Sequence, residues 1–320
     1  MNCATHFTFS NDQLLLFIIP TEECNFRCKY CYESFKIKRM HEGVVLGIKN
    51  FLSARMPELL KLNINWFGGE PLLNYRAMID IMQHAIGLGT SNPNLEIKSG
   101  ASTNASLLTP RILESLCRLR VTDFQITLDG DADSHDLLRV SRDKTPTFDI
   151  IWKNLVAAHK SKANFKFLLR IHVNKLNENN CYKLLRKISD DIGNDERFVI
   201  YVRELSRLGG PNDADLPTEN NSKKLKFVIS EIINEAKRLG LLVENENVAQ
   251  RICYASVPNS FVFRADGSIS KCTVDLYSKK NIVGHIMPDG KLSIDVDKIE
   301  WWSRGLVNNN INQMICPLME

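Results

Sequence analysis

Short apolar and β-branched runs alternate with longer amphipathic stretches from residue 14 to about residue 205. The runs have the length of buried strands, and the stretches between them repeat apolar residues at helical spacing. This alternation predicts an α/β fold with a parallel sheet. The expected strands cover residues 14–20, 62–67, 94–100, 122–128, 165–173 and 198–204. The expected helices cover residues 43–55, 75–88, 109–118, 149–160 and 179–190.

Six strand–helix units predict a partial (β/α)6 barrel of the TIM-like kind, over residues 1–205. In parallel α/β folds the functional loops follow the carboxyl ends of the strands. Here three cysteines follow the first strand and Gly-Gly-Glu-Pro, residues 68–71, follows the second. Ser-Thr-Asn-Ala-Ser (102–106) and Leu-Asp-Gly-Asp (128–131) follow the third and fourth. We therefore expect a functional site at this edge of the sheet.

The pattern changes after residue 205. Residues 206–221 are rich in Gly, Pro, Asn and Asp, which indicates a linker or a substrate-facing loop, and a helix is expected at 222–240. Two hairpins are expected at 261–272 and 282–294, with turns at the two Asp-Gly pairs. These features predict a small C-terminal α+β domain over residues 241–320.

Composition narrows the class of protein. The 320 residues include 41 basic and 37 acidic side chains, and the lysine clusters are scattered along the chain, which argues against a nucleic-acid partner. The longest apolar run is far below the roughly 18 residues of a membrane span, and no basic segment precedes it as in a signal peptide. We expect a cytoplasmic protein that does not bind a membrane. In that compartment nine cysteines favour metal or redox chemistry over disulfides.

The cysteines after the first strand have the spacing Cys-x3-Cys-x2-Cys: Cys24, Cys28 and Cys31. This spacing would also place them on one face of a buried helix, but the residues between them are too polar for that. Three thiolates are one short of a structural zinc site and of the usual ligand set of a cubane iron–sulfur cluster. The residues alone leave zinc and iron–sulfur both open.

Three motifs together resemble the radical S-adenosylmethionine (SAM) superfamily: the cysteine motif, Gly-Gly-Glu-Pro and Leu-Asp-Gly. The resemblance implies that the three cysteines hold three irons of a [4Fe–4S] cluster, whose fourth iron binds the amino and carboxylate groups of SAM. It also implies that one electron from the cluster cleaves SAM and releases a 5′-deoxyadenosyl radical, which takes a hydrogen atom from the substrate. The chain is thus expected to be an enzyme.

The resemblance also suggests residues that contact SAM. Gly68, Gly69 and Glu70 match the loop that receives the SAM ammonium group, although a tight turn with Glu70 at a helix N-terminus is the alternative. Glycines would let the backbone approach the ligand. Tyr30 is expected near the adenine of SAM, and Thr127 and Asp129, at the end of the fourth expected strand, are expected to contact SAM. Arg139 or Arg170 is expected to pair with the SAM carboxylate. Tyr30 packing on the sheet, or either arginine in a barrel ion pair, is the alternative.

A second group of cysteines lies near the C-terminus: Cys253, Cys272 and Cys316. They resemble the SPASM or shorter twitch extension, which implies one auxiliary [4Fe–4S] cluster with either an open iron or a fourth ligand, for which Cys3 is a weak candidate. A zinc site is the alternative. Cys117 and Cys181 lie in helical stretches and are expected to be core or helix-end residues.

Enzymes with this extension mostly modify ribosomally made peptides or protein side chains. The leading hypothesis is a maturase that forms a thioether or carbon–carbon cross-link. Formylglycine formation in a sulfatase, peptide epimerisation, and a small-molecule dehydrogenase or isomerase are alternatives, as is a non-catalytic zinc or iron–sulfur module. Only 23 residues precede Cys24, so a separate leader-binding protein or the barrel rim would recognise the peptide. An electron donor such as flavodoxin or ferredoxin is implied.

Overall fold

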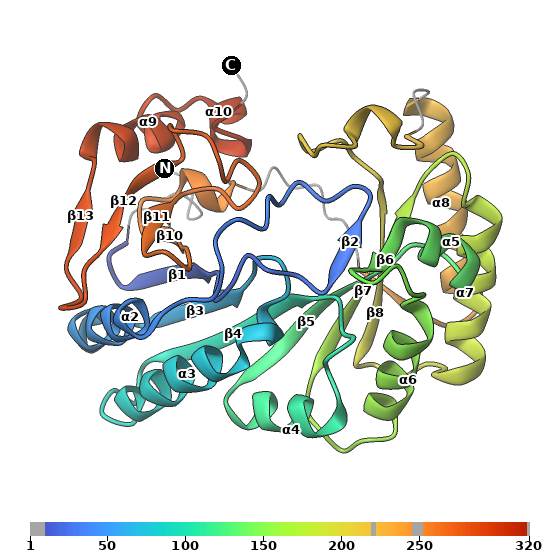
Figure 1. The fold of residues 1–320 in the computed structure, drawn as a ribbon, viewed down its shortest axis with the longest axis horizontal. Helices are drawn as coiled ribbons and strands as arrows, with labels where there is room; N and C mark the ends of the chain where they lie inside the picture. Colours follow the sequence, from blue (N-terminus) through green and yellow to red (C-terminus); the bar gives the residue numbers. More distant parts are fainter. Residues whose placement is uncertain (1–9, 219–221, 245–251, 319–320) are drawn as a thin grey trace. The chain divides into compact units, whose positions relative to one another are not determined.

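The computed structural model describes residues 10–218, 222–244 and 252–318. The chain divides into two compact units, which are drawn in Figure 1. The first unit comprises Met1–Glu23, Ser34–Gly100 and Asn247–Glu320, and the second comprises Cys24–Glu33 and Ala101–Glu246. The cysteine motif therefore belongs to the second unit, whereas Gly-Gly-Glu-Pro and the C-terminal cysteines belong to the first. The domain division expected from the sequence, 1–205, 206–240 and 241–320, stays a prediction.

The first unit is built on β1, whose alternate residues Leu14, Leu16 and Ile18 are buried. β1 pairs in parallel with β3 on one side and with β10 on the other. Antiparallel strands β11, β12 and β13 continue the sheet beyond β10. The strands of this unit are β1 (Gln13–Ile18), β3 (Lys61–Trp66), β10 (Ser260–Phe263), β11 (Ser268–Ser270), β12 (Ile282–Ile286) and β13 (Leu292–Ile294).

Helices cover the strands of the first unit and bury one apolar face each. α2 and α3 lie side by side beneath β1 and β3, as Figure 1 shows. The buried residues of α2 include Ile48 and Leu52, at the i, i+4 spacing that puts side chains on one face. The helices are α2 (Glu42–Arg55), η1 (Met56–Glu58), η2 (Pro71–Asn74), α3 (Tyr75–Gly89), η4 (Tyr254–Ser256), α9 (Val296–Val307) and α10 (Ile311–Ile315).

The second unit continues the strand–helix alternation. β4 (Glu96–Thr103) begins in the first unit and ends in the second. β5, β7, β8 and β9 then pair with one another in parallel in that order. These strands are β5 (Val121–Leu128), β7 (Lys166–Val173), β8 (Phe198–Glu204) and β9 (Leu242–Val243). The helices are α4 (Pro110–Arg118), α5 (Ala132–Leu138), α6 (Phe148–His159), α7 (Glu178–Asp191), η3 (Asp213–Asp215) and α8 (Ser222–Arg238).

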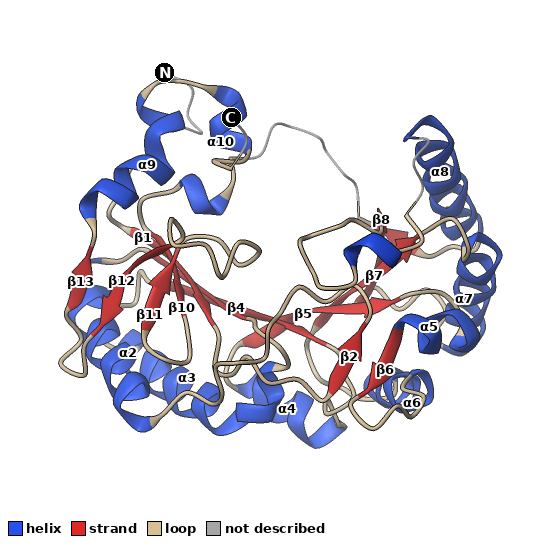
Figure 2. Ribbon diagram, turned by 45° about the horizontal axis from the view of Figure 1, so that its top comes forward, coloured by secondary structure: helices blue, strands red, loops and turns tan. Residues whose placement is uncertain are grey.

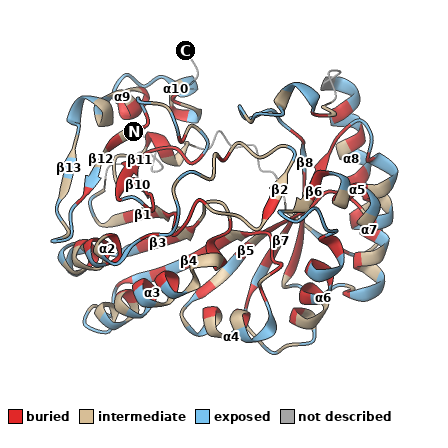
Figure 3. Cartoon of the chain, in the orientation of Figure 1, coloured by how far each residue is buried: buried red, intermediate tan, exposed pale blue. Residues whose placement is uncertain are grey.

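Aromatic side chains fill the core between these strands. Phe167 packs edge-on against Phe124 and Phe198, with ring centroids 5.6 and 5.2 Å apart. Edge-to-face contacts of this kind add stabilisation beyond the burial of apolar area. The strands of this unit are accordingly coloured as largely buried in Figure 3.

The strands and helices expected from the sequence are all present, with ends shifted by three residues or fewer, and so are the two hairpins. The sequence did not indicate α5, β9 or the short antiparallel pair β2 (Phe26–Cys28) and β6 (Arg139–Ser141). Strands of two or three residues are too short for a periodic pattern. Their pairing also depends on contacts between residues that are distant in the chain.

Arg197 fastens the loops at the amino-terminal ends of β7 and β8. Its guanidinium group donates hydrogen bonds to the backbone carbonyls of His159, Ser161 and Ala163, and it pairs with Asp195 at 2.7 Å. His159 Nδ1 lies 2.9 Å from the same carboxylate. Burial alone would raise the pKa of Asp195, but the hydrogen bonds from Arg197 and His159 lower it to about 2.

We predict that Asp195→Asn lowers the melting temperature by a few degrees at neutral pH. Because the folded-state pKa of Asp195 is depressed, its stabilisation is present above about pH 4 and is lost as the pH falls towards 2. The difference between wild type and variant should therefore shrink over this window in thermal unfolding followed by circular dichroism. Asp143→Asn, in an exposed turn, is the control. A difference in melting temperature that does not change with pH would show that the charge of Asp195 does not stabilise the fold.

Candidate active site

The cysteine motif runs through the short antiparallel pair β2–β6, which Figure 2 shows. Cys28 ends β2 and lies directly opposite Arg139 at the start of β6. The backbone N–H of Lys29 donates to the carbonyl of Leu138 at 2.8 Å, which extends the pairing beyond Cys28. The motif is therefore an extended segment fastened to a second strand, and the buried-helix interpretation is wrong.

The three thiols lie in partly buried surroundings. Cys24 Sγ accepts a hydrogen bond from the backbone N–H of Phe26 at 3.3 Å, and Asn104 Nδ2 lies 3.9 Å from it. Burial raises the pKa of Cys28, and it raises the pKa of Cys31 to about 12. The free thiols of Cys28 and Cys31 are thus protonated at neutral pH, so metal binding there must release protons. Among the described residues no three His, Cys, Asp or Glu side chains are arranged as a metal site. The ligand set stays a prediction.

Tyr30, between Cys28 and Cys31, takes part in a buried hydrogen-bonded chain. Arg139 Nη1 donates to the Tyr30 hydroxyl at 2.6 Å, and that hydroxyl donates to Asp129 Oδ2, also at 2.6 Å. The structure thus brings together three residues that the sequence proposed separately as SAM contacts.

His172, on β7, extends this chain and was not proposed from the sequence. Its Nδ1 donates to Asp129 Oδ1 at 3.1 Å, and its ring meets that of Tyr30 edge-on. One feature of the sequence could have indicated His172: it lies two residues after Arg170 on an expected strand, and side chains two residues apart on a strand point to the same face. Both carboxylate oxygens of Asp129 therefore have partners.

The protonation states of this chain follow from its burial. Burial alone would raise the pKa of Asp129, but hydrogen bonding from His172 and the charge of Arg139 hold that pKa well below its ordinary value. Burial lowers the pKa of His172 and raises that of Tyr30, so both remain neutral. The chain is thus a carboxylate that accepts two hydrogen bonds, joined through a phenol to a guanidinium group.

Arg139 and Arg170 differ in their surroundings. The Arg139 side chain is almost fully buried, and its Nε has no hydrogen-bond partner among the described residues. Arg170 Nε donates to the Thr127 hydroxyl at 3.3 Å, so Thr127 and Arg170 also lie together. An orphaned buried donor costs roughly 1–3 kcal/mol unless something accepts from it. Arg139 thus fits an anionic ligand group beside Cys28.

The Gly-Gly-Glu-Pro loop packs against the residues that precede Cys24. The N–H of Gly69 donates to the carbonyl of Thr21, and the N–H of Glu70 donates to that of Glu23. A Cβ on Gly69 would stand only 2.5 Å from the Glu22 carbonyl oxygen, and Gly68 has a φ of +115°. Both glycines are thus required by close contact within the protein itself, a reason that the sequence did not suggest.

Glu70 is fully buried, and its carboxylate accepts a hydrogen bond from the backbone N–H of Leu72 at 3.1 Å. This contact caps η2, as in the turn-and-cap alternative raised from the sequence. The role in binding the SAM ammonium group stays a prediction.

A buried ion pair holds the same segment from another side. Arg264 donates from Nε and Nη2 to Glu22 Oε1 at 2.8 and 2.6 Å, and both side chains are almost completely buried. The Tyr277 hydroxyl lies 3.4 Å from the other carboxylate oxygen. The sequence did not indicate this pair, because no local pattern distinguishes a buried charge from an exposed one. It ties β10 to the residues just before Cys24.

The three C-terminal cysteines each lie at the end of a short element of the first unit. Cys253 precedes η4, Cys272 follows β11, and Cys316 follows α10. The N–H of Cys253 donates to the carbonyl of Met314. Burial raises the pKa of Cys253, and negative charge on Cys272 and Cys316 would raise it further. These thiols fit the donor set of a metal centre, although the described residues do not show a formed one.

Lys271, next to Cys272, is another functional candidate that the sequence did not indicate. It is completely buried, and its Nζ donates to the carbonyls of Val257 and Ser260 at 2.6 Å each. Burial lowers its pKa to about 7.

The remaining cysteines behave as expected or lie outside the described residues. Cys181 is buried in α7, and Cys117 is partly buried in α4. Cys3 lies outside the described residues.

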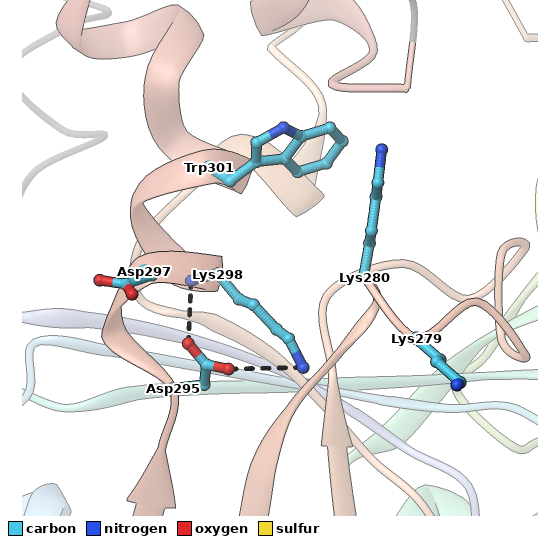
Figure 4. Close-up of a pocket in the computed structure, with 6 residues that line it drawn as sticks. All are labelled: Lys279, Lys280, Asp295, Asp297, Lys298 and Trp301. Carbon is cyan, nitrogen blue, oxygen red and sulfur yellow. Dashed lines mark hydrogen bonds and ion pairs between the residues drawn. The ribbon is translucent and has the colours of Figure 1, made fainter.

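A surface cavity of about 440 Å³ lies in the C-terminal part of the first unit, and Figure 4 shows it. The indole of Trp301 faces the Asp295–Lys298 ion pair across it, with Lys280 at one side. Its lining includes none of the residues proposed from the sequence.

Sequence relatives share short parts of the chain. The radical SAM cyclopropyl synthase TigE of Paramaledivibacter caminithermalis is 26% identical over 120 residues, which are 32% of this chain and 25% of that protein. The serine-type anaerobic sulfatase-maturating enzyme of Klebsiella aerogenes is 25% identical over 158 residues, 47% of this chain and 37% of that protein. The chain thus matches well under half of the length of each.

Solved structures match nearly the whole chain. Native anSMEcpe with bound AdoMet matches with a TM-score of 0.67 at 16% identity. The match covers 90% of this chain and 83% of the anSMEcpe chain. Streptococcus suis SuiB bound to the precursor peptide SuiA matches with a TM-score of 0.62 at 16% identity. This match covers 91% of this chain and 66% of the SuiB chain. This likeness confirms the predicted fold class, an α/β partial barrel followed by C-terminal antiparallel strands. Among the described residues no helix combines the length and apolar character needed to cross a membrane.

We predict that Tyr30→Phe lowers the free energy of unfolding by roughly 1–3 kcal/mol, because it removes the hydrogen-bond partner of Arg139 Nη1 and of Asp129 Oδ2. Urea unfolding followed by circular dichroism measures this change. Tyr201→Phe is the matched control, because the Tyr201 hydroxyl accepts from an exposed arginine, Arg203. Equal losses of unfolding free energy in the two variants would show that the buried hydrogen-bonded chain contributes nothing to stability.

The family model described as the radical SAM superfamily matches residues 18–188, which is more than half of the chain. The matched region contains the cysteine motif, the Gly-Gly-Glu-Pro loop, Tyr30 and its partners Asp129 and Arg139. The chain therefore belongs to the radical SAM superfamily.

Proposed function

We propose that the chain is a radical SAM maturase that acts on a peptide or protein side chain. This proposal rests on the cysteine segment, which pairs with β6 through β2. It rests also on the buried Arg139 beside it, whose Nε has no partner among the described residues. When bound, the cluster and SAM supply the 5′-deoxyadenosyl radical that removes a hydrogen atom from the substrate.

The chain's own residues bind and orient the two groups. Cys24, Cys28 and Cys31 provide three thiolates on one extended segment, which fits a cluster with one open iron. Arg139 offers its buried Nε–H, which has no partner in the described part of the chain, to the SAM carboxylate as a strong charge-assisted contact. Asp129 and Tyr30 keep this guanidinium group in place. Arg170, which donates to Thr127, is the alternative partner for the carboxylate.

Gly68, Gly69 and Glu70 are proposed to receive the SAM ammonium group through backbone atoms and the buried carboxylate. The close packing of this loop on Thr21 and Glu23 supports the proposal, because it gives the loop a fixed conformation. Direct contacts of Tyr30 with adenine, and of Thr127 and Asp129 with SAM, remain predictions from the resemblance.

The substrate class is proposed from the relatives. SuiB is bound to the precursor peptide SuiA, and anSMEcpe is bound to AdoMet and the Kp18Cys peptide. The match to a cyclopropyl synthase supports bond formation, and the precursor peptide on SuiB supports a peptide substrate. The proposed product is therefore a thioether or carbon–carbon cross-link within a ribosomally made peptide. Such a product is lighter than its precursor by two hydrogens.

Formylglycine formation is the second candidate, because part of the sequence resembles a serine-type anaerobic sulfatase-maturating enzyme. An aldehyde-reactive hydrazide labels formylglycine and does not label a cross-link, so it separates the two candidates. Peptide epimerisation would leave the mass unchanged.

Cys253, Cys272 and Cys316 are proposed to hold one auxiliary [4Fe–4S] cluster. The electrostatic influence of Cys272 and Cys316 on Cys253 supports a shared site, for which zinc is the alternative. A flavodoxin or ferredoxin as electron donor and a separate leader-binding protein complete the proposal.

We predict that the triple variant C24A/C28A/C31A loses SAM cleavage to below detection. Without these thiolates the cluster that would bind SAM and pass an electron to it cannot form. The measurement is 5′-deoxyadenosine formed by anaerobically reconstituted, dithionite-reduced protein, quantified by chromatography. Cys117→Ala, a cysteine outside both groups, should retain wild-type cleavage. Cleavage that persists in the triple variant would refute the proposed function.

We predict that C253A/C272A/C316A lowers the iron content from about eight to about four atoms per chain. SAM cleavage without substrate should survive, because it needs only the cluster held by the first three cysteines. The modified peptide should disappear. Unchanged iron, or stoichiometric zinc by elemental analysis in protein produced with ample iron, would show that the C-terminal cysteines do not hold an iron–sulfur cluster.

A further inference from the structure

The segment Arg207–Asp215 follows β8 and lies within residues 206–221, whose composition predicts a linker or a substrate-facing loop. The structure gives it a compact conformation of its own. Arg207 Nε donates to the carbonyl of Asp213 at 2.8 Å, and the N–H of Gly209 donates to the Asp213 carboxylate at 2.7 Å. Gly209 has a φ of +87°, which favours glycine at this turn.

The segment is also anchored at both ends. Leu205 and Leu216, just before and just after it, are each 4% exposed. The carbonyl of Pro217 accepts a hydrogen bond from the N–H of Lys175 at 3.1 Å. A flexible linker would lack these internal and terminal contacts.

The segment makes two contacts with the cysteine motif, on either side of Tyr30. Asn212 Nδ2 donates to the carbonyl of Lys29 at 3.2 Å. A Cβ on Gly210 would lie only 2.6 Å from the Cys31 carbonyl oxygen and 3.2 Å from its carbon, so only glycine approaches this closely. The backbone from Lys29 to Cys31 is therefore held by this segment, while the Tyr30 side chain is held by Asp129 and Arg139.

We propose that Arg207–Asp215 is a strap that positions the Cys31 end of the cysteine motif and thereby slows the loss of the bound cluster in air. The proposal rests on the proposed function, in which Cys24, Cys28 and Cys31 hold that cluster. Contacts that hold the backbone of a metal ligand keep that ligand oriented, and their loss weakens metal binding, so a looser Cys31 backbone should speed the loss of the cluster. Gly210 and Asn212 are positioning residues, since they act through the backbone of the motif.

The test uses anaerobically reconstituted protein exposed to air-saturated buffer, with loss of the cluster's visible absorbance followed over time. To isolate the first cluster, the variants are made in the C253A/C272A/C316A background. Gly210→Ala and Asn212→Asp should bleach several-fold faster than the parent. Aspartate has the size of asparagine but cannot donate to the Lys29 carbonyl. Asn212→Gln retains a donor and should restore part of the protection.

Two matched controls separate the strap from general effects of substitution. Gly87→Ala in α3 places a methyl group where no atom lies within 4 Å. Asn234→Ala in α8 removes an exposed side-chain contact to Glu231. Both should bleach at the parental rate. The reduced cluster's electron paramagnetic resonance spectrum with SAM should change in the strap variants and remain unchanged in the controls.

The possible outcomes distinguish this proposal from the proposed function. A cluster that forms normally but bleaches within twofold of the parental rate in both Gly210→Ala and Asn212→Asp would overturn the strap alone. A parent protein that binds no iron–sulfur cluster would overturn both proposals. If Gly210→Ala does not fold, the comparison of Asn212→Asp with Asn212→Gln decides the question.

Discussion

The buried chain from Arg139 through Tyr30 to Asp129 is the constraint on which the cysteine segment depends. A guanidinium group and a carboxylate are both removed from water here, and the phenol between them satisfies one hydrogen bond of each. Burying charge without such partners would cost several kcal/mol, so this chain selects a single conformation of the segment. Cys28, opposite Arg139 on β6, is positioned by the same arrangement.

The residues just before Cys24 are fixed by a different means. Thr21 and Glu23 accept backbone hydrogen bonds from the Gly-Gly-Glu-Pro loop, and Glu22 pairs with Arg264 in the interior. The glycines of this loop are needed for its contact with the protein's own backbone, whether or not a ligand is bound. A buried pair such as Glu22–Arg264 adds little net stability, but removing either partner is strongly destabilising. It therefore specifies a conformation more than it strengthens the fold.

The C-terminal cysteines lie in a part of the first unit that is organised by polar groups in the interior. Asn281 Oδ1 accepts from the backbone N–H groups of Lys271 and Cys272, which fixes the chain at Cys272. The ammonium group of Lys271 is satisfied by backbone carbonyls of residues 257–260. A side chain that is costly to bury, placed beside a cysteine, is more readily explained by the chemistry of a site than by packing alone.

The sequence by itself determined the strands and helices of the partial barrel, the two C-terminal hairpins and the superfamily. Those features depend on periodic patterns of apolar residues and on motifs whose residues are adjacent in the chain. Tertiary structure alone decided the β2–β6 pairing, the roles of His172 and Arg264, and the contact of Gly210 with Cys31. Each joins residues far apart in sequence, and each depends on burial, which turns an ordinary polar side chain into an obligatory partner. A single sequence carries no local signal for such partnerships.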